Sequence, residues 1–220
     1  MPILALEKLF CKISGDDILD WKDLLKPYRL GCIDQENEAA ARSEFQRDYD
    51  RIIFSSAFRR LQGKTQVFPL PETDVIHNRL THSLETFAVG RSLGNMVGKE
   101  LKIEDDNGNI IDGKVFGELV SAACLTHDIG NPPFGHSGED TISEFFGSTS
   151  GDKILKYLNN NQRADFINFE GNAMGFYLLT NSNPEVTEVK GGLGLTYPTL
   201  ATFTKYPRST SLDNVDKGRA

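Results

Sequence analysis

The 220-residue sequence is poor in cysteine and tryptophan and has no long apolar run. Its three cysteines, Cys11, Cys32 and Cys124, form no C-x-x-C pair, which excludes a disulfide framework or a zinc knuckle and fits a reducing compartment. No stretch approaches the roughly 20 apolar residues of a membrane span. Glu7 and Lys8 interrupt the apolar start, which argues against a signal peptide. We therefore expect a cytoplasmic protein with no membrane partner.

Several nucleotide-binding motifs are missing as well. The sequence contains no Walker-A loop, no G-x-G-x-x-G and no G-x-S-x-G, which excludes P-loop transfer, dinucleotide binding and the α/β-hydrolase elbow. A formal net charge of −7 and a pI of about 5.2 argue against a protein that coats nucleic acid non-specifically. An anionic substrate would therefore need a local cluster of basic side chains.

Helical periodicity is the main structural signal in this chain, and it predicts an all-α fold. The predicted helices cover residues 18–25, 43–62, 79–99, 116–129, 138–146, 169–180 and 197–200. The second begins at a Ser43–Gln46 capping box. The turn at residues 105–108 predicts one small β-hairpin, and residues 64–78 are expected to form an ordered loop. We divide the chain into an extension (1–40), a helical domain (41–207) and a polar tail (208–220).

The helix at 79–99 carries an apolar face at helical spacing, which we expect to be buried. Its members are Leu80, Leu84, Phe87, Ala88, Met96 and Val97.

His127 and Asp128 are the most informative pair in the sequence. Imidazole nitrogen and carboxylate oxygen are ligands of divalent metal ions. Two adjacent ligands can meet one ion only where their helix ends, and Gly130 with Pro132-Pro133 ends it: glycine suits a left-handed position, and prolines cannot continue a helix.

His82 supplies a further imidazole on a separate helix. A single histidine is more often structural than functional, so convergence with His127-Asp128 is a tertiary prediction. His77 lies five residues before His82, and we place it on the loop surface, facing away from His82.

His136 and Glu139 lie three residues apart at the start of a predicted helix, so their side chains can share a face and hydrogen-bond. A carboxylate beside an imidazole favours its protonated form and equips His136 to act as an acid. A solvent-facing pair near the helix N-terminus is an equally good interpretation.

Basic side chains could gather around phosphates, and two of them stand out. Arg79 lies one helical turn before His82, and guanidinium suits bidentate phosphate contact. Lys205 lies near a helix end, where the helix dipole also accounts for a lysine. The other basic residues of this group are Arg51, Arg59, Arg60, Lys64 and Arg208.

Together these segments resemble the dGTPase family, the deoxynucleoside triphosphate triphosphohydrolases of the HD-domain superfamily. The segments that carry the resemblance are residues 49–62, 64–69, 79–83, 127–139, 169–173 and 195–207.

The resemblance implies an HD-domain helical bundle that hydrolyses a dNTP, dGTP first among them, to deoxynucleoside and inorganic triphosphate with Mg²⁺ or Mn²⁺. The matching positions are the metal ligands His82, His127 and Asp128, the catalytic pair His136 and Glu139, and the substrate contacts Gln66, Arg79, Asn172, Lys205 and Tyr206. Family members often form homo-oligomers, sometimes with nucleotides or single-stranded DNA as effectors.

The family's fourth metal ligand is an aspartate on a later helix, and no such segment precedes Ala220; Asp213 and Asp216 stand in the polar tail. We therefore expect an N-terminal fragment of a larger enzyme, with weak or no turnover. Two alternatives stay open: an HD phosphodiesterase or nucleotidase that cuts another bond, and a non-catalytic nucleotide-binding or oligomerisation module.

Overall fold

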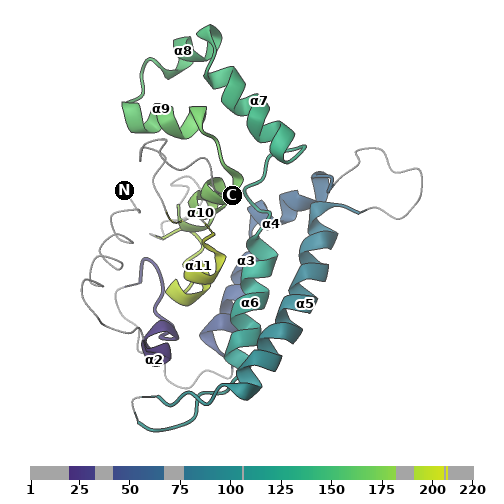
Figure 1. Ribbon diagram of the computed structural model, residues 1–220, viewed down its shortest axis with the longest axis vertical. Helices are drawn as coiled ribbons and strands as arrows, with labels where there is room; N and C mark the ends of the chain where they lie inside the picture. Colours follow the sequence, from purple (N-terminus) through teal and green to yellow (C-terminus); the bar gives the residue numbers. More distant parts are fainter. Residues whose placement is uncertain are drawn as a thin grey trace.

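The computed structural model describes residues 20–32, 42–66, 77–105, 107–181, 191–205 and 207. Within these ranges the chain folds into α-helices and one 3₁₀ turn, with no sheet, so the all-α prediction is confirmed (Figure 1). The elements are α2 Trp21–Leu24, α3 Glu44–Phe54, α4 Ser56–Arg59, η1 Arg60–Gly63, α5 Arg79–Glu100, α6 Lys114–Thr126, α7 His136–Phe146, α8 Thr149–Leu155, α9 Asn160–Ile167, α10 Gly171–Thr180 and α11 Tyr197–Phe203. The predicted hairpin is a single antiparallel bridge between Glu104 and Ile110.

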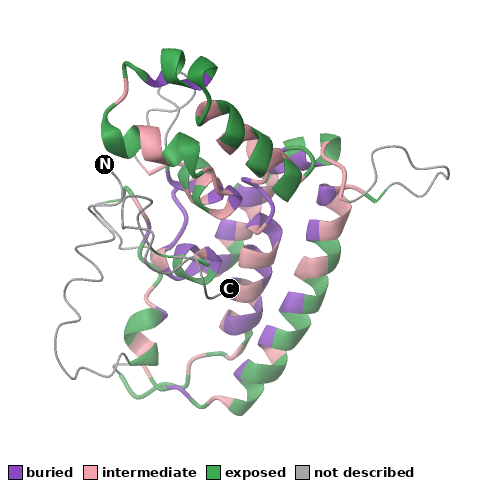
Figure 2. Ribbon diagram, turned by 45° about the horizontal axis from the view of Figure 1, so that its top comes forward, coloured by how far each residue is buried: buried purple, intermediate pink, exposed green. Residues whose placement is uncertain are grey.

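Helix α6 is the central element. It packs against α5, α3 and α11, and its Ala122 and Leu125 are fully buried in the main apolar core. Buried residues gather on α6 and the elements around it, whereas α7, α8 and α9 form a largely exposed group at one end (Figures 1 and 2). The apolar composition of residues 116–129 therefore predicted a buried helix correctly.

The buried residues of α5 are mostly small, so the predicted apolar face is only partly correct: Leu80 and Phe87 pack against the main core, whereas other members of that face are exposed. Gly90, Gly94 and Gly98 are buried, whereas Met96 is 64% exposed and Leu84 43%. A Cβ atom on Gly94 would lie 2.5 Å from the backbone oxygen of Phe116, so only glycine lets the two helices come this close. Leu84, Met96 and Val97 are consequently turned outward.

The helix predicted over 43–62 is interrupted at Ser55. The Ser55 backbone is extended, its N–H donates to the carbonyl of Ile52, and its Oγ accepts from Phe58 N. Ser55 thus ends α3 and caps α4. At the other end, Ser43 Oγ accepts from Gln46 N as predicted, but the Gln46 amide donates to Glu118 rather than closing a capping box.

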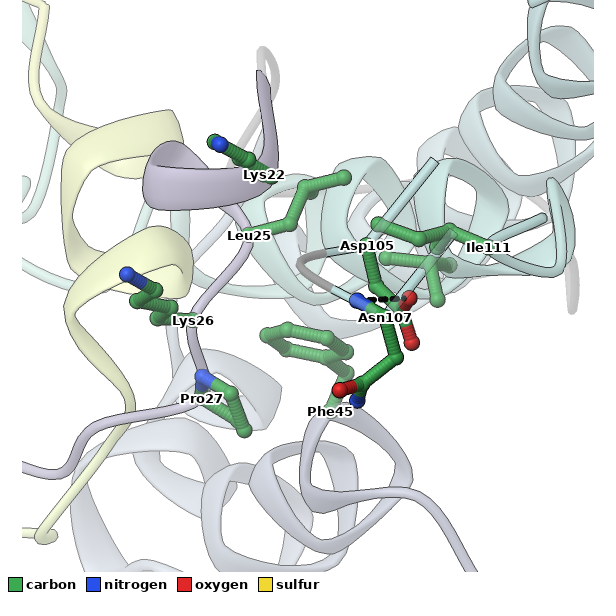
Figure 3. A pocket seen from close by; sticks show the side chains of 9 residues that line it. Lys22, Leu25, Lys26, Pro27, Phe45, Asp105, Asn107 and Ile111 are labelled. Carbon is green, nitrogen blue, oxygen red and sulfur yellow. Dashed lines mark hydrogen bonds between the residues drawn. The ribbon is translucent and has the colours of Figure 1, made fainter. Parts of the chain in front are cut away.

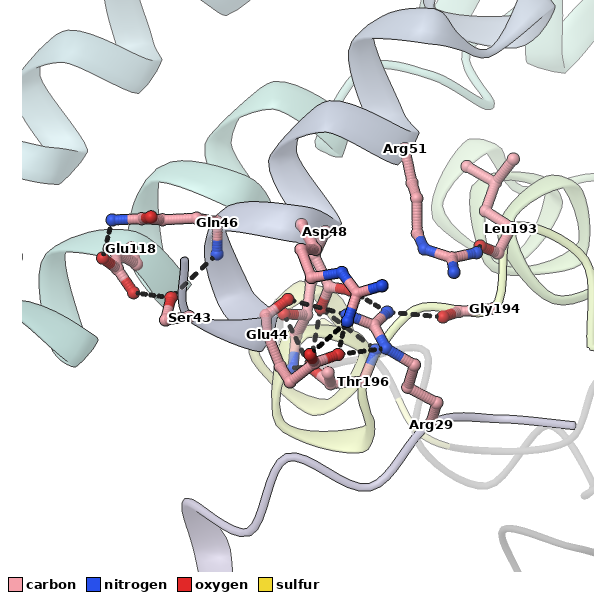
Figure 4. Close-up of polar contacts among 12 residues, drawn as sticks. Arg29, Ser43, Glu44, Gln46, Asp48, Arg51, Glu118, Leu193, Gly194 and Thr196 are labelled. Carbon is pink, nitrogen blue, oxygen red and sulfur yellow. Dashed lines mark hydrogen bonds and ion pairs between the residues drawn. The ribbon is translucent and has the colours of Figure 1, made fainter. Parts of the chain in front are cut away.

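A buried polar network joins the segment after α2 to α3 and α11 (Figure 4). The Arg29 guanidinium donates to Asp48 Oδ1 at 2.6 Å, to Glu44 Oε2 at 2.6 Å and to the carbonyl of Gly194 at 2.8 Å. Asp48 Oδ2 accepts from the backbone N–H and the hydroxyl of Thr196, the N-cap of α11. This network fixes α11 against the bundle.

A hollow of about 270 Å³ lies between α2, the start of α3 and the hairpin (Figure 3). Leu25, Phe45, Ile111 and Val115 supply its apolar lining, with Lys22 and Asp105 at its edge. None of the predicted site residues lines it.

Candidate metal centre

His82 lies in the first turn of α5, where local chemistry fixes the helix start. Asn78 is the N-cap, and its side chain and that of Thr81 form a reciprocal capping box. Asn78 also pairs with Thr65 in an antiparallel bridge, and its amide donates to the carbonyl of Gln62. The entry to α5 is therefore held against the segment that follows η1.

His127 and Asp128 lie immediately after α6, in turns that the hydrogen bonds Ile129 N to Thr126 O and Asn131 N to Asp128 O define. The sequence suggested a left-handed backbone conformation at Gly130, and this prediction is wrong. Positive φ angles occur instead at Phe134 and Gly135. Gly130 is required by packing, because a Cβ there would lie 2.1 Å from the backbone of Gly171 in α10.

The structure brings the three predicted metal ligands together. One ligand atom from each of His82, His127 and Asp128 lies within 4.8 Å of the others, and the two imidazole centroids are 5.1 Å apart. We call these residues the inner triad. His127 Nδ1 lies 2.7 Å from the carbonyl of Cys124, so Nδ1 carries the proton and Nε2 presents its lone pair.

The donor set of the inner triad fits a divalent cation. Asp128 Oδ1 accepts from the Asn131 side-chain amide at 2.7 Å, whereas the buried Asp128 Oδ2 has no hydrogen-bond partner in the described part of the chain. Arg79 Nη1 lies 2.9 Å from Oδ2 as an ion pair without hydrogen-bonding geometry, and His127 Nε2 lies 3.4 Å from it. A buried carboxylate oxygen left in this way is able to coordinate a cation.

Two basic side chains adjoin Asp128. Arg79 is buried, and its Nε has no hydrogen-bond partner among the described residues. Lys64 Nζ donates to the carbonyl of Asn131 at 2.6 Å. Burial, and then the charge of Arg79, lower the pKa of Lys64 below its usual value. Two cations beside one carboxylate leave an excess of positive charge that suits an anionic ligand.

His136 and Glu139 form the predicted hydrogen-bonded pair at the start of α7. His136 Nδ1 lies 2.9 Å from Glu139 Oε2, and Glu139 Oε1 accepts from the backbone N–H of Gly171 at 2.9 Å. The His136 side chain is 98% exposed and that of Glu139 14%. Glu139 is thus anchored on α10, while the outer edge of the His136 ring faces open space.

The remaining predicted substrate contacts are more scattered. The buried Oε1 of Gln66 has no hydrogen-bond partner among the described residues, and the Asn172 amide donates to Glu170 in the first turn of α10. Lys205 is exposed after α11, and Tyr206 lies outside the described residues. The polar tail and its two aspartates also lie outside them.

Sequence reasoning did not single out two residues of the centre. Asn131 orients Asp128, and Lys64 adjoins Arg79. The sequence did contain a pointer to each residue. Asn131 is the first polar residue after Asp128, and Lys64 is a basic residue in the segment 64–69 that carries the family resemblance.

Comparison with known proteins gives two results. A family model described as HD domain matches residues 79–172, a range that contains both triad histidines, Asp128, His136 and Glu139. It lies inside the predicted 41–207 domain, whose boundaries stay a prediction.

The chain is also similar to proteins named deoxyguanosinetriphosphate triphosphohydrolase-like protein. One from Pseudomonas aeruginosa (strain LESB58) is 50% identical over 189 residues, which are 86% of this chain and 42% of the relative. Relatives from Synechocystis and Listeria monocytogenes are 48% and 36% identical, each over 87% of this chain and 43% of the relative. The chain therefore spans less than half the length of these relatives.

None of the described helices is long and apolar enough to cross a membrane.

Proposed function

We propose that this chain, which belongs to the HD-domain superfamily, carries the metal centre of a dNTP triphosphohydrolase. The proposal starts from its similarity to deoxyguanosinetriphosphate triphosphohydrolase-like proteins. The observation that carries the proposal is the inner triad, in which the buried Oδ2 of Asp128 has no hydrogen-bond partner among the described residues. The proposed products are deoxynucleoside and inorganic triphosphate, with dGTP as the leading substrate and Mg²⁺ or Mn²⁺ as the cofactor.

His82, His127 and Asp128 would hold the divalent cation, and the chemistry supplied there is Lewis-acid polarisation of a phosphoryl oxygen. The inner triad offers two neutral nitrogen ligands and one carboxylate, so it leaves most of the cation's charge available to phosphate. Arg79 and Lys64 offset further phosphate charge beside Asp128. Lys205, Gln66, Asn172 and Tyr206 are the proposed contacts to the rest of the nucleotide.

His136 is the proposed acid–base group. Its Nδ1 bonds to Glu139, so the proton that it exchanges with substrate is carried on Nε2. Glu139 is held in turn by Gly171 N, which fixes the orientation of the imidazole. In this role His136 either protonates the leaving 5′-oxygen or accepts the proton of the attacking water.

The proposal is tested by nucleotide binding and product analysis together. We expect calorimetry to show that dGTP binds in the presence of Mn²⁺ and that His127→Ala or Asp128→Asn abolishes this binding. Any turnover should release triphosphate, which anion-exchange chromatography separates from pyrophosphate and orthophosphate. Loss of turnover in His136→Ala with unchanged Mn²⁺ binding would support the acid–base role.

Each alternative has its own signature in these experiments. Pyrophosphate or orthophosphate as the product would replace the proposal by a phosphodiesterase or nucleotidase. Metal-dependent dGTP binding without turnover in a chain extended to the full length of its relatives would indicate a non-catalytic module. Equal dGTP binding by wild type and His127→Ala would overturn the metal-centred proposal altogether.

Assembly into a homo-oligomer, with nucleotide or single-stranded DNA effectors, completes the proposal. It is supported by the apolar row Val89, Leu93 and Met96 on α5, whose members are 60%, 56% and 64% exposed. Light scattering of wild type and Leu93→Lys tests it: an oligomer that dissociates in the variant supports assembly through this row, and equal masses contradict it.

A further inference from the structure

A second group of metal-ligating side chains lies beside the inner triad. One ligand atom from each of His77, His82 and Glu85 lies within 4.8 Å of the others, and the His77 and His82 ring centroids are 6.0 Å apart. We call these residues the outer triad. The expectation that His77 points away from His82 is therefore wrong.

The geometry of the outer triad follows from the start of α5. His82 and Glu85 are three residues apart in the helix, so their side chains project from the same face. His77 directly precedes the N-cap Asn78, which is held by its capping box and its bridge to Thr65. These contacts fix the direction in which the chain enters α5 and so place His77 over the first turn.

We propose that the outer triad is a second metal site, which takes a first-row transition metal ion such as Zn²⁺ or Ni²⁺ and, in doing so, withdraws His82 from the inner triad. The second half of this proposal rests on the proposed function of the inner triad; the first half does not.

The donor set defines the class of ion. Two imidazoles and one carboxylate, which are also the donor set of the inner triad, suit borderline ions such as Zn²⁺ and Ni²⁺. His77 and Glu85 are exposed, so water can complete the coordination of the ion. The inner triad, in contrast, lies beside the cations Arg79 and Lys64, which lower its affinity for a divalent ion when no anion is bound.

His82 cannot serve both sites at once. A neutral imidazole has one nitrogen with a free lone pair, and its other nitrogen carries the proton. Whichever nitrogen coordinates, an ion in the outer triad therefore leaves the inner triad with His127 and Asp128 alone. A transition metal at the outer site would thus act as an inhibitor of inner-site chemistry.

The site is tested by Zn²⁺ titration of the 220-residue chain in competition with a chromophoric chelator. We expect His127→Ala to retain one bound Zn²⁺, because the outer triad is complete in that variant. Adding His77→Ala or Glu85→Gln to it should weaken Zn²⁺ binding by more than about tenfold, since even indirect support of a ligand contributes 10–100-fold to metal affinity. Circular dichroism checks that each variant is folded.

Three controls make the result specific. His136→Ala, which removes the one histidine outside both triads, should leave Zn²⁺ affinity within about twofold of wild type. Wild type should bind one Zn²⁺ per chain, and His82→Ala should lose tight binding.

The outcomes separate this proposal from the previous one. If adding His77→Ala to the His127→Ala chain leaves its Zn²⁺ affinity unchanged, the outer site is overturned. This conclusion holds whether or not the chain binds dGTP. Two Zn²⁺ ions per wild-type chain would overturn the exclusive use of His82. Failure of dGTP binding with the Zn²⁺ pattern intact would remove the proposed hydrolase function and leave the outer site standing.

Discussion

Two buried arginine–aspartate pairs in the described ranges look alike in composition but differ in how completely they are satisfied. In the first, Asp48 accepts hydrogen bonds at both oxygens, from Arg29 and from Thr196, and Arg29 also bonds to Glu44 and Gly194 (Figure 4). In the second, Asp128 Oδ2 and Arg79 Nε are buried without a hydrogen-bond partner, although the ion pair spans only 2.9 Å.

The difference distinguishes a structural pair from a binding site. A closed network leaves no coordination capacity, so it can only hold α11 to α3 and the segment after α2. An unsatisfied buried carboxylate has an unfavourable solvation energy that a bound cation relieves. The two pairs should therefore respond differently to mutation, to metal and to pH.

The largest effect is expected from breaking the fully hydrogen-bonded Arg29–Asp48 pair. Asp48→Ala removes the fully buried carboxylate of the two that pair with Arg29 and leaves Glu44 in place; removing one partner of a buried pair typically costs about 3–5 kcal/mol. Urea denaturation should show a loss of this size in the free energy of unfolding. The folded fraction should still bind Mn²⁺, because Asp48 contributes nothing to the inner triad.

The matched control is Asp152→Ala, which removes the partner of Arg163 in an exposed ion pair. Exposed pairs contribute about 0–1 kcal/mol, so this variant should unfold almost as wild type does. An Asp48→Ala variant that is no less stable than this control would show that water replaces Asp48 and that the network is not closed.

The closed network and the metal centre also differ in how far the sequence predicted them. His127 and Asp128 could be identified because two ligands are adjacent where prolines force a helix to end. Their convergence with His82 could only be carried over from the family resemblance, since the positions lie about 45 residues apart. Nothing in the local sequence around Arg29, Asp48 or Thr196 indicated that these residues meet.

Tertiary packing accounts for the predictions that failed. The spacing of Leu84 and Met96 on α5 indicated a buried apolar face, but close approach of α6 required the glycine face instead. The four-residue spacing of Gly90, Gly94 and Gly98 was the signal that could have shown it. Gly130 was likewise explained by a local rule, although the approach of α10 is what excludes a side chain there.

A smaller effect is expected from the one hydrogen bond that orients Asp128. Asn131→Ala removes the amide that donates to Asp128 Oδ1 but keeps all three ligands of the inner triad. Groups that orient a metal ligand typically contribute 10–100-fold to affinity. Calorimetric titration with Mn²⁺ should show a weakening within that range.

Asn168→Ala is the control for this variant, because the Asn168 side-chain amide donates to the carbonyl of Ala164 in α9, the helix that Asn168 caps. Its Mn²⁺ affinity should equal that of wild type. Unchanged affinity in Asn131→Ala would mean that Asp128 is held in place by Arg79 alone.

The smallest effect concerns pH, and it comes from Lys64, which lies beside the Arg79–Asp128 pair. Burial and the charge of Arg79 lower the pKa of Lys64, so this side chain loses its proton at a lower pH than the usual 10.5. Binding of inorganic triphosphate should therefore weaken as pH rises through the lowered pKa, by about tenfold, because a hydrogen bond to a charged group contributes about 1.5–3 kcal/mol.

The stability of the unliganded chain should change in the opposite direction over the same range. Between the lowered pKa of Lys64 and 10.5 the unfolded chain binds more protons than the folded one, so this group makes the free energy of unfolding rise with pH. Lys64→Arg keeps its charge throughout and should abolish both trends. If triphosphate binding weakens equally with pH in Lys64→Arg, the pH dependence belongs to the ligand or to another group. Lys64 would then make no contribution to anion binding beside the Arg79–Asp128 pair.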